Sequence, residues 1–258
     1  MRIAINYAII TAILICGGLI PSAASAATPL HWQSLATGLD YTVIYPSPTM
    51  PLQKIHAFRI DLKKYKLTLI LAKNYQKKSI FVNQVAQNIN ALIAINGGFF
   101  SPQSQPLGLR INSGKVLHPL KNTSWWGVFI VKNSRAMIVP KSGFRYSKNI
   151  QFAIQAGPRL IVNGTIPKLR ENVANRSALG VTRNGNVIIV ATQNLALSTT
   201  QLASIMQRPE KQGGLACYNG LNLDGGNSSQ LYAHVGNFNL KIQSFRPVTD
   251  VIVVTQRQ

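Results

Sequence analysis

The chain has 258 residues, 46% of them hydrophobic, and carries 27 Lys and Arg against six Asp and Glu, for a formal net charge of +21. That length suffices for one large domain or two small ones, and we expect one because no acidic or Ser/Gly-rich linker interrupts the pattern. The positive charge attracts anions, and the scarcity of acids limits how many carboxylates a catalytic site can contain.

The N-terminus has the organisation of a secretory signal peptide. A positive start at Met1 and Arg2 precedes a mostly apolar stretch over residues 3–20, and small residues at 24–26 form a cleavage pattern. We therefore expect residues 1–26 to be removed and the protein to be exported, periplasmic or secreted, without a transmembrane segment. A retained membrane anchor is the alternative. After cleavage Cys217 is the only cysteine, so no disulfide can form within the chain.

Residues 27–54 are predicted to be a lead-in, loosely attached over its first part, and residues 55–258 a single domain. Strand patterns rich in Val, Ile and aromatic residues dominate, at 41–46, 55–62, 66–72, 91–95, 107–111, 126–132, 135–140, 150–156, 159–162, 177–182, 186–192, 219–223, 229–235 and 248–254. Asn163-Gly164 and Asn184-Gly185 are typical of short hairpin turns.

Only two helices are predicted. Residues 79–88 have helical apolar spacing, and residues 198–207 begin with a capping box formed by Ser198 and Gln201. The expected fold class is α+β, with a large, mainly antiparallel or mixed β-sheet and few helices.

Two segments share a design that is typical of a ligand site. Residues 221–229, LNLDGGNSS, place Asp224 between an apolar strand pattern and a Gly-Gly pair, and residues 91–100, ALIAINGGFF, place Asn96 before a second such pair. Glycines allow a ligand to approach the backbone closely, so a polar side chain at the end of a buried strand is well placed for binding. We expect the two strand ends to converge on one pocket.

Most of the six carboxylates have simpler explanations than catalysis. Asp61 stands beside two lysines, which indicates a solvated surface ion pair, and three others are discounted because they fall in a turn, in a loop or at the start of the terminal strand: Asp40, Glu210 and Asp250. Glu171 lies in a polar stretch, although its nearness to Arg176 keeps it open as a second carboxylate. Asp224 remains the main candidate, and a turn residue that caps local amides is its alternative.

Four motifs occur in the order seen in phosphodiester glycosidases: NGGFF at 96–100, QAGPRLIVNG at 155–164, NRSALGVT at 175–182 and LNLDGGNSSQL at 221–231. The chain resembles this family over roughly residues 55–254, and bacterial members are often described as exopolysaccharide-related. The resemblance implies hydrolysis of a sugar-1-phosphodiester in a glycan or exopolysaccharide. Asn227 departs from the pattern, because the family often has another small residue or proline there, and this bears on substrate detail more than on fold.

The composition is compatible with this chemistry. Ordinary glycosidases need one carboxylic acid to protonate the leaving group and a second carboxylate as base or nucleophile. A phosphate monoester has a second pKa of roughly 6 and departs without full protonation, so one carboxylate and cations can suffice. In this hypothesis Asp224 is the base for water or the nucleophile at the anomeric carbon, and Arg176 binds the phosphate in a bidentate fork. Asn96, Ser228 and Ser229 would hold sugar hydroxyls or phosphate oxygens.

The amides of the two Gly-Gly pairs are expected to form anion-binding nests. The expected substrate-binding set is therefore Gly97, Gly98, Phe99, Phe100, Asn222, Gly225, Gly226, Ser228 and Ser229. For the two phenylalanines, burial in the core is the alternative. Of the adjacent Trp125 and Trp126, one is expected to face the core because neighbours in a strand alternate faces.

No cofactor and no metal are expected, since the four histidines show no ligand spacing. A cation held by Asp224, Asn222 and Asn96 stays open. The expected partner is an anionic sugar-phosphate or polysaccharide, with peripheral association with the cell envelope open. No nucleic acid is expected, because the cations are not interleaved with aromatics. The alternative function is a non-catalytic basic envelope protein that binds anionic polysaccharide, lipid headgroups or nucleic acid.

Overall fold

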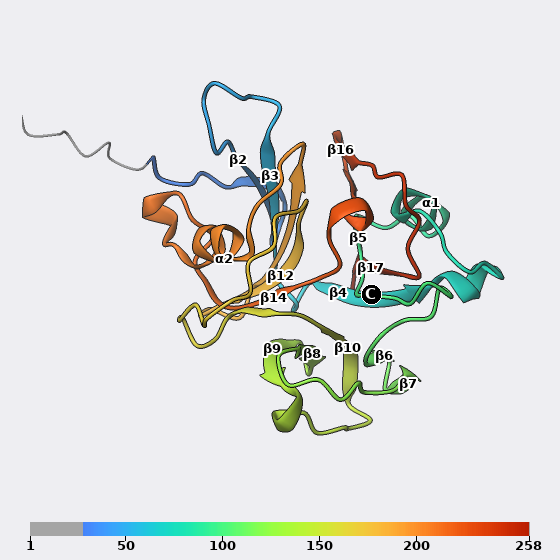
Figure 1. Cartoon of the computed structure of the whole chain (residues 1–258). Coiled ribbons are helices and arrows are strands. Elements are labelled where there is room, and N and C mark those ends of the chain that lie inside the picture. The colour runs from blue at the N-terminus through green and yellow to red at the C-terminus, as the bar shows by residue number, and fades with distance from the viewer. Residues whose placement is uncertain (1–27, 258) are drawn as a thin grey trace, which may run out of the picture.

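The computed structural model describes residues 28–257, so the predicted signal peptide lies outside the described residues. Three β-sheets and two α-helices make up most of this part of the chain (Figure 1). Every strand pairing in the described residues is antiparallel. The α+β class, the antiparallel pairing and the small number of helices are therefore confirmed, while the expected large sheet is divided into three.

The first sheet has seven strands, in the order β1 (Gln33–Ala36), β2 (Leu39–Ile44), β3 (Lys54–Ile60), β13 (Val187–Gln193), β12 (Ser177–Thr182), β14 (Cys217–Asn222) and β11 (Arg159–Ile161). Its first two strands come from the predicted lead-in. Leu39 is completely buried, and β2 pairs with β3 along its whole length. The lead-in is therefore part of the sheet rather than loosely attached, because its apolar side chains complete the core.

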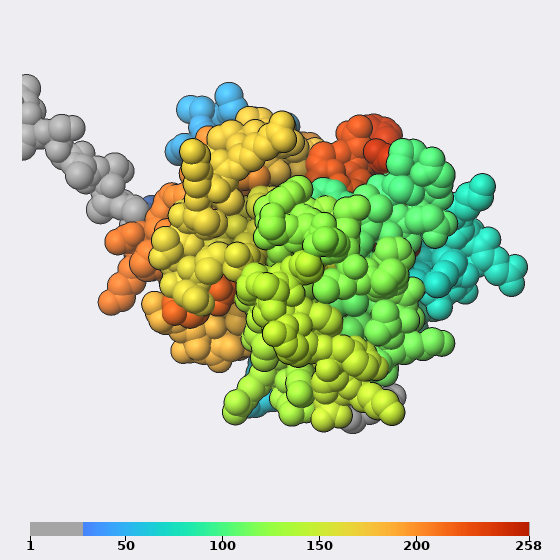
Figure 2. Space-filling model, turned by 60° about the horizontal axis from the view of Figure 1, so that its bottom comes forward, coloured from blue at the N-terminus to red at the C-terminus, as the bar shows by residue number. Residues whose placement is uncertain are grey.

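The second sheet has five strands, in the order β7 (Lys115–His118), β6 (Arg110–Asn112), β10 (Ile150–Ala156), β8 (Gly127–Lys132) and β9 (Arg135–Pro140). It forms the green front of the molecule in Figure 2. The third sheet has the order β16 (Phe238–Ile242), β15 (Leu231–Val235), β5 (Ile93–Asn96), β17 (Asp250–Gln256) and β4 (Tyr65–Leu71). Strands β1, β7 and β16 were not predicted. Each lies at a sheet edge and is largely exposed, so it lacks a strong apolar pattern.

The main core lies where the three sheets meet. Leu179 and Ile189 of the first sheet, Phe152 of the second and Ile95 and Ile252 of the third belong to one buried cluster. Each such side chain contributes about 1.5–3 kcal/mol by leaving water. The convergence of three sheets holds the strand ends of the first and third sheets close together.

Two helices cover the outer faces of the first and third sheets. Helix α2 (Thr199–Gln207) begins with the predicted capping box, in which the Ser198 hydroxyl accepts from the Gln201 amide at 3.2 Å, and it packs on the first sheet. Helix α1 (Val82–Asn88) packs on the third sheet and begins later than predicted because Ile80 forms a β-bridge with Val248. Neither helix, nor any other helix within residues 28–257, is long and apolar enough to cross a membrane.

Candidate active site

The two Gly-Gly segments converge as predicted. Strand β5 ends at Asn96, and the Asn96 amide nitrogen donates to the carbonyl of Asp224 at 2.8 Å. In the reverse direction, the backbone amide of Asp224 donates to the Gly97 carbonyl at 3.3 Å. The segments that follow β5 and β14 are therefore bonded to each other although 128 residues separate Asn96 from Asp224.

Asn96 is a buried cross-link rather than an exposed ligand-binding group. Its Oδ1 accepts from the Ser177 hydroxyl at 2.7 Å and from the Gln230 amide at 3.1 Å, and its Nδ2 also donates to the Gly97 carbonyl at 3.2 Å. A side-chain amide offers two N–H donors and a carbonyl with two lone pairs. These three contacts and the bond to the Asp224 carbonyl therefore use all the hydrogen-bonding capacity of the Asn96 side chain. Asn96 thus positions the Asp224 segment and has no group left for a sugar hydroxyl.

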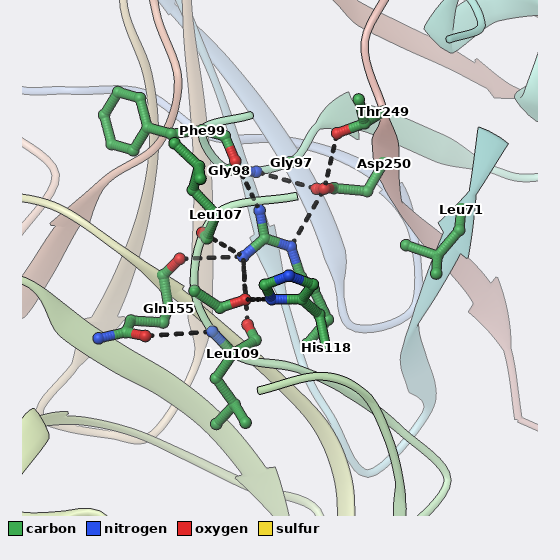
Figure 3. A network of polar contacts seen from close by, with 12 residues as sticks. Leu71, Gly97, Gly98, Phe99, Leu107, Leu109, His118, Gln155, Thr249 and Asp250 are labelled. Carbon is green, nitrogen blue, oxygen red and sulfur yellow. Dashed lines mark hydrogen bonds and ion pairs between the residues drawn. The ribbon is translucent and has the colours of Figure 1, made fainter. Parts of the chain in front are cut away.

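The amides of the first Gly-Gly pair bind a carboxylate of the protein itself. Gly98 N–H donates to Oδ1 of Asp250 at 3.0 Å (Figure 3). Gly97 N–H donates to the Asp250 carbonyl at 2.9 Å. A Cβ at Gly97 would lie 1.7 Å from Asp250 Oδ1, which explains why glycine stands there. The nest expected to receive substrate is already filled, and Asp250, discounted from its position in the sequence, is a central part of the site.

Arg110 neutralises this buried carboxylate. Its Nε lies 3.1 Å from Asp250 Oδ2, and both side chains are 0% exposed. The guanidinium also donates to a ring of carbonyls, those of Leu107, Gly108, Leu109, Gln155 and Phe99. The ion pair of Arg110 and Asp250 joins the start of β17 to β6 and to the segment that follows Gly97 and Gly98. Sequence reasoning missed Arg110, although a single charge inside the apolar strand pattern at 107–111 was the available signal.

Asp224 itself is half-buried, with Oδ1 accepting from the Gly225 amide at 3.0 Å. Burial raises the pKa of its carboxyl, and the negative charge of Asp250 raises it further. Hydrogen bonds from Ser228 and Gly225 and the charge of Arg246 act in the opposite direction but do not cancel the effect of burial. The result is a carboxylate that holds its proton to a higher pH than an ordinary aspartate.

The cation that acts on Asp224 is Arg246, not Arg176. Arg246 is exposed, and its guanidinium carbon lies 4.9 Å from the centre of the Phe100 ring. Arg176 is buried, with Nε donating to the Leu197 carbonyl at 2.8 Å. Because the neighbouring Ser177 points to Asn96, Arg176 points to the opposite face of the first sheet. These contacts do not favour the predicted role of Arg176 as the phosphate clamp.

The remaining predicted site residues are distributed around the Asp224 turn. The short 3₁₀ turn Gly226–Ser228 carries Gly226, whose amide donates to the Asn175 carbonyl at 2.8 Å, so this second nest is also occupied. Ser228, Ser229 and Asn222 are each nearly buried. Asn222 Nδ2 donates to the Gly157 carbonyl at 3.1 Å, whereas Asn222 Oδ1 has no hydrogen-bond partner among the described residues.

The aromatic residues after the first Gly-Gly pair are partly in the core. Phe99 stacks on Trp126 with ring centres 5.1 Å apart, and both it and Phe100 pack against buried clusters. Trp126 is 5% exposed and Trp125 58% exposed, which confirms that one of the adjacent tryptophans faces the core.

The described surface has hollows of different sizes. One of about 760 Å³ lies between the first described residues, β2 and α2, and one of about 640 Å³ lies beside Arg183 and Tyr218. No predicted site residue lines either of them. A smaller hollow of about 230 Å³ is lined by Asn227 and Ser229 of the Asp224 turn, so it adjoins the site.

Comparison with known proteins identifies the family of the chain. The family model of phosphodiester glycosidases matches residues 90–255, more than half of the chain. The chain therefore belongs to the phosphodiester glycosidase family, and this membership supports a glycosidase-type function.

Solved structures share the fold. The zebrafish N-acetylglucosamine-1-phosphodiester alpha-N-acetylglucosaminidase catalytic domain, auto-inhibited by its pro-peptide, is similar with a TM-score of 0.65 and 16% identity, over 90% of this chain and 87% of that one. A Synechocystis protein has a TM-score of 0.60 and 18% identity, over 90% of this chain and 64% of that one. Among curated sequences, the protein YigE of Escherichia coli is 36% identical over 113 residues, which are 39% of this chain and 44% of the relative. That match spans less than half of the relative's length.

Proposed function

We propose that the protein is an exported hydrolase that cleaves the bond between a sugar and phosphate in a sugar-1-phosphodiester of a glycan or exopolysaccharide. The observation that carries the proposal is Asp224, a half-buried carboxylate of raised pKa on a glycine-rich turn, in a chain of the phosphodiester glycosidase family. Export rests on the signal-peptide pattern of residues 1–26.

The other carboxylates have structural partners. Asp61 Oδ1 accepts from the Lys63 amide at 2.8 Å, so it caps a turn instead of forming the expected lysine ion pair. Glu171 is exposed and bonds to Thr199 and Thr200 at the start of α2. Three are paired with arginine: Asp40, Glu210 and Asp250. Asp224 is thus the carboxylate that best fits a catalytic role.

A single carboxylate suits this bond. Because phosphate leaves with the bonding electron pair as a stable anion, no second carboxyl is needed to protonate it, unlike the alkoxide of an ordinary glycoside. A raised pKa makes ionised Asp224 a stronger base near neutral pH. It either removes a proton from the water that attacks the anomeric carbon or attacks that carbon itself.

We assign the phosphate contact to Arg246 in place of Arg176. The guanidinium of Arg246 is exposed and already held over the Phe100 ring, so binding an anion costs this side chain little conformational freedom. The charge of Arg246 already acts on the Asp224 carboxylate, so a phosphate bound there lies within reach of the same site. Asn96 and Ser228 support Asp224 in this scheme and need not touch the sugar.

The test is hydrolysis of a panel of sugar-1-phosphodiesters, beginning with N-acetylglucosamine esters because the name of the zebrafish relative specifies that sugar. We expect Asp224→Asn to lower kcat by about 100-fold or more, the usual size of a base or nucleophile effect. Asp61→Asn is the matched control, since Asn can keep the bond to the Lys63 amide. Unchanged turnover in folded Asp224→Asn protein would remove this residue from the mechanism.

The net positive charge of the chain favours the alternative, a non-catalytic basic envelope protein. Of the Lys and Arg in the described chain, only Arg59 and Arg110 form ion pairs, so most cations are available to anionic partners. Such a binder would lose affinity gradually with added salt and would be indifferent to Asp224→Asn.

Fractionation of cells, with N-terminal sequencing of the mature protein, tests export: cleavage after Ala26 is expected.

A further inference from the structure

We propose that the small hollow beside the Asp224 turn binds one uncharged sugar residue of the substrate. This inference rests on the proposed function and deepens it by naming a part of the substrate. The hollow has a volume of about 230 Å³ and lies between the end of β13, Asn175 and the loop that follows β16. We call it the amide pocket because five of its lining side chains are amides: Asn175, Gln193, Asn194, Asn227 and Gln243.

The lining matches sugar hydroxyls rather than phosphate. Besides the amides, the hydroxyls of Thr192, Ser229 and Ser244 line the pocket, and none of its lining residues is charged. In a protein with a net charge of +21, an anion site without Lys or Arg would be anomalous. Gln193, Asn194 and Ser244 already form side-chain hydrogen bonds within the protein. The lining side chains left to pair with an uncharged saccharide include Asn175, Asn227 and Gln243, whose amides both donate and accept as sugar hydroxyls do.

Ser229 provides an independent sign of a missing ligand. Its side chain is 3% exposed, and its Oγ has no hydrogen-bond partner among the described residues. A buried hydroxyl without a partner is costly, and native proteins rarely leave one unexplained. Because the Ser229 Oγ is buried where it stands, a rotation of the side chain about its Cα–Cβ bond would be needed to bring the hydroxyl to a ligand in the amide pocket, which Ser229 lines.

Size and the rim favour a single sugar ring. The pocket is smaller than the roughly 300–1,000 Å³ of sites that enclose drug-sized ligands, so it suits one monosaccharide. Phe245, at the rim, is 99% exposed, and covering such a ring with the apolar C–H face of a sugar is favourable.

The position of the pocket connects it to the reaction. Asn227 and Ser229 follow Asp224 within the same turn, and the Gly226 amide of that turn donates to the Asn175 carbonyl. Phe245 precedes Arg246, whose charge acts on Asp224. A substrate with its phosphate at Arg246 therefore has a neighbouring sugar residue within reach of the pocket.

The experiment measures binding of phosphate-free methyl glycosides, including methyl N-acetylglucosaminide, to the full chain by titration calorimetry. We expect saturable binding that is equal in wild type and Asp224→Asn, and at least tenfold weaker in Phe245→Ala and in Ser229→Ala. Tyr146→Ala, which removes a 52% exposed aromatic from the chain after the second sheet's β9, is the matched control. With a cleavable phosphodiester, the pocket variants should raise KM and leave kcat nearly unchanged.

The outcomes separate this inference from the proposed function. Saturable binding of methyl glycosides without hydrolysis of any phosphodiester would refute the hydrolase and support the pocket. Hydrolysis with no binding of methyl glycosides at millimolar concentration, or with a KM that Phe245→Ala and Ser229→Ala leave unchanged, would refute the pocket alone. Equal competition by inorganic phosphate would also overturn it, because an uncharged ligand site should ignore phosphate.

Discussion

Replacing Asp250 by Asn should strongly destabilise the protein. Asn has the volume of Asp and can still accept from the Gly98 amide, so the variant removes the charge without creating a cavity. It leaves the Arg110 guanidinium, which is 0% exposed, without a counter-ion. Loss of one partner of a buried ion pair costs about 3–5 kcal/mol.

The contacts of Arg110 place the effect near the lower end of that range. Its five carbonyl acceptors remain in the variant and disperse part of the unpaired charge, so we expect a loss of about 3 kcal/mol. For a domain of this size, 1 kcal/mol lowers Tm by about 2–4 °C, so Tm should fall by about 6–12 °C. Total stabilities of domains are about 5–15 kcal/mol, so the variant should still fold.

Urea and thermal unfolding of Asp250→Asn beside wild type measure this loss. The urea midpoint should fall with little change in slope. Asp61→Asn, at a surface turn, should stay within about 0.5 kcal/mol of wild type. A loss below about 1 kcal/mol for Asp250→Asn alone would refute the reasoning that this pair holds the site together.

Four further predictions concern Gly97, Asp224 and Cys217. Gly97→Ala should destabilise more than Gly226→Ala, because the new Cβ would meet Asp250 Oδ1. At Gly226 nothing lies within 4 Å of a Cβ, and alanine is strained there only by the positive φ of 58°. Equal unfolding midpoints would contradict this. The acidic limb of kcat/KM should lie above the ordinary aspartate pKa of 3.8, because burial raises the pKa of Asp224. Because the folded-state pKa of Asp224 is raised, the stability of the wild type falls as pH rises from the unfolded-state pKa to the folded-state pKa. Asp224→Asn should therefore be more stable than wild type at pH 7 and lose that advantage below about pH 3.8. Urea unfolding midpoints of both proteins at the two pH values test this. Cys217 is 3% exposed and burial raises the pKa of its thiol, so iodoacetamide should label it only after unfolding, as peptide mass spectrometry can establish.

Local patterns in the sequence were sufficient to predict the class of fold and the convergence of the two Gly-Gly segments. Apolar alternation and turn chemistry act over a few residues, so most strands of the three sheets and the capped helix α2 could be predicted. The repeated design of a buried strand followed by a polar residue and Gly-Gly identified two segments, at 96–98 and 224–226, that are bonded to each other in the folded chain. Edge strands such as β7 and β16 were not predicted, because half-exposed strands lack a continuous apolar face.

The partners of polar side chains were decided only by tertiary structure. Asp250 and Arg110 are 140 residues apart, and no local pattern reports that the order of strands in two sheets brings them into contact. The direction of Arg176 likewise depends on which face of the first sheet receives α2. The amides of Gly97 and Gly98 are occupied because β17 begins where β5 ends. Periodicity shows that a residue is buried, whereas its neighbours depend on how distant strands are ordered.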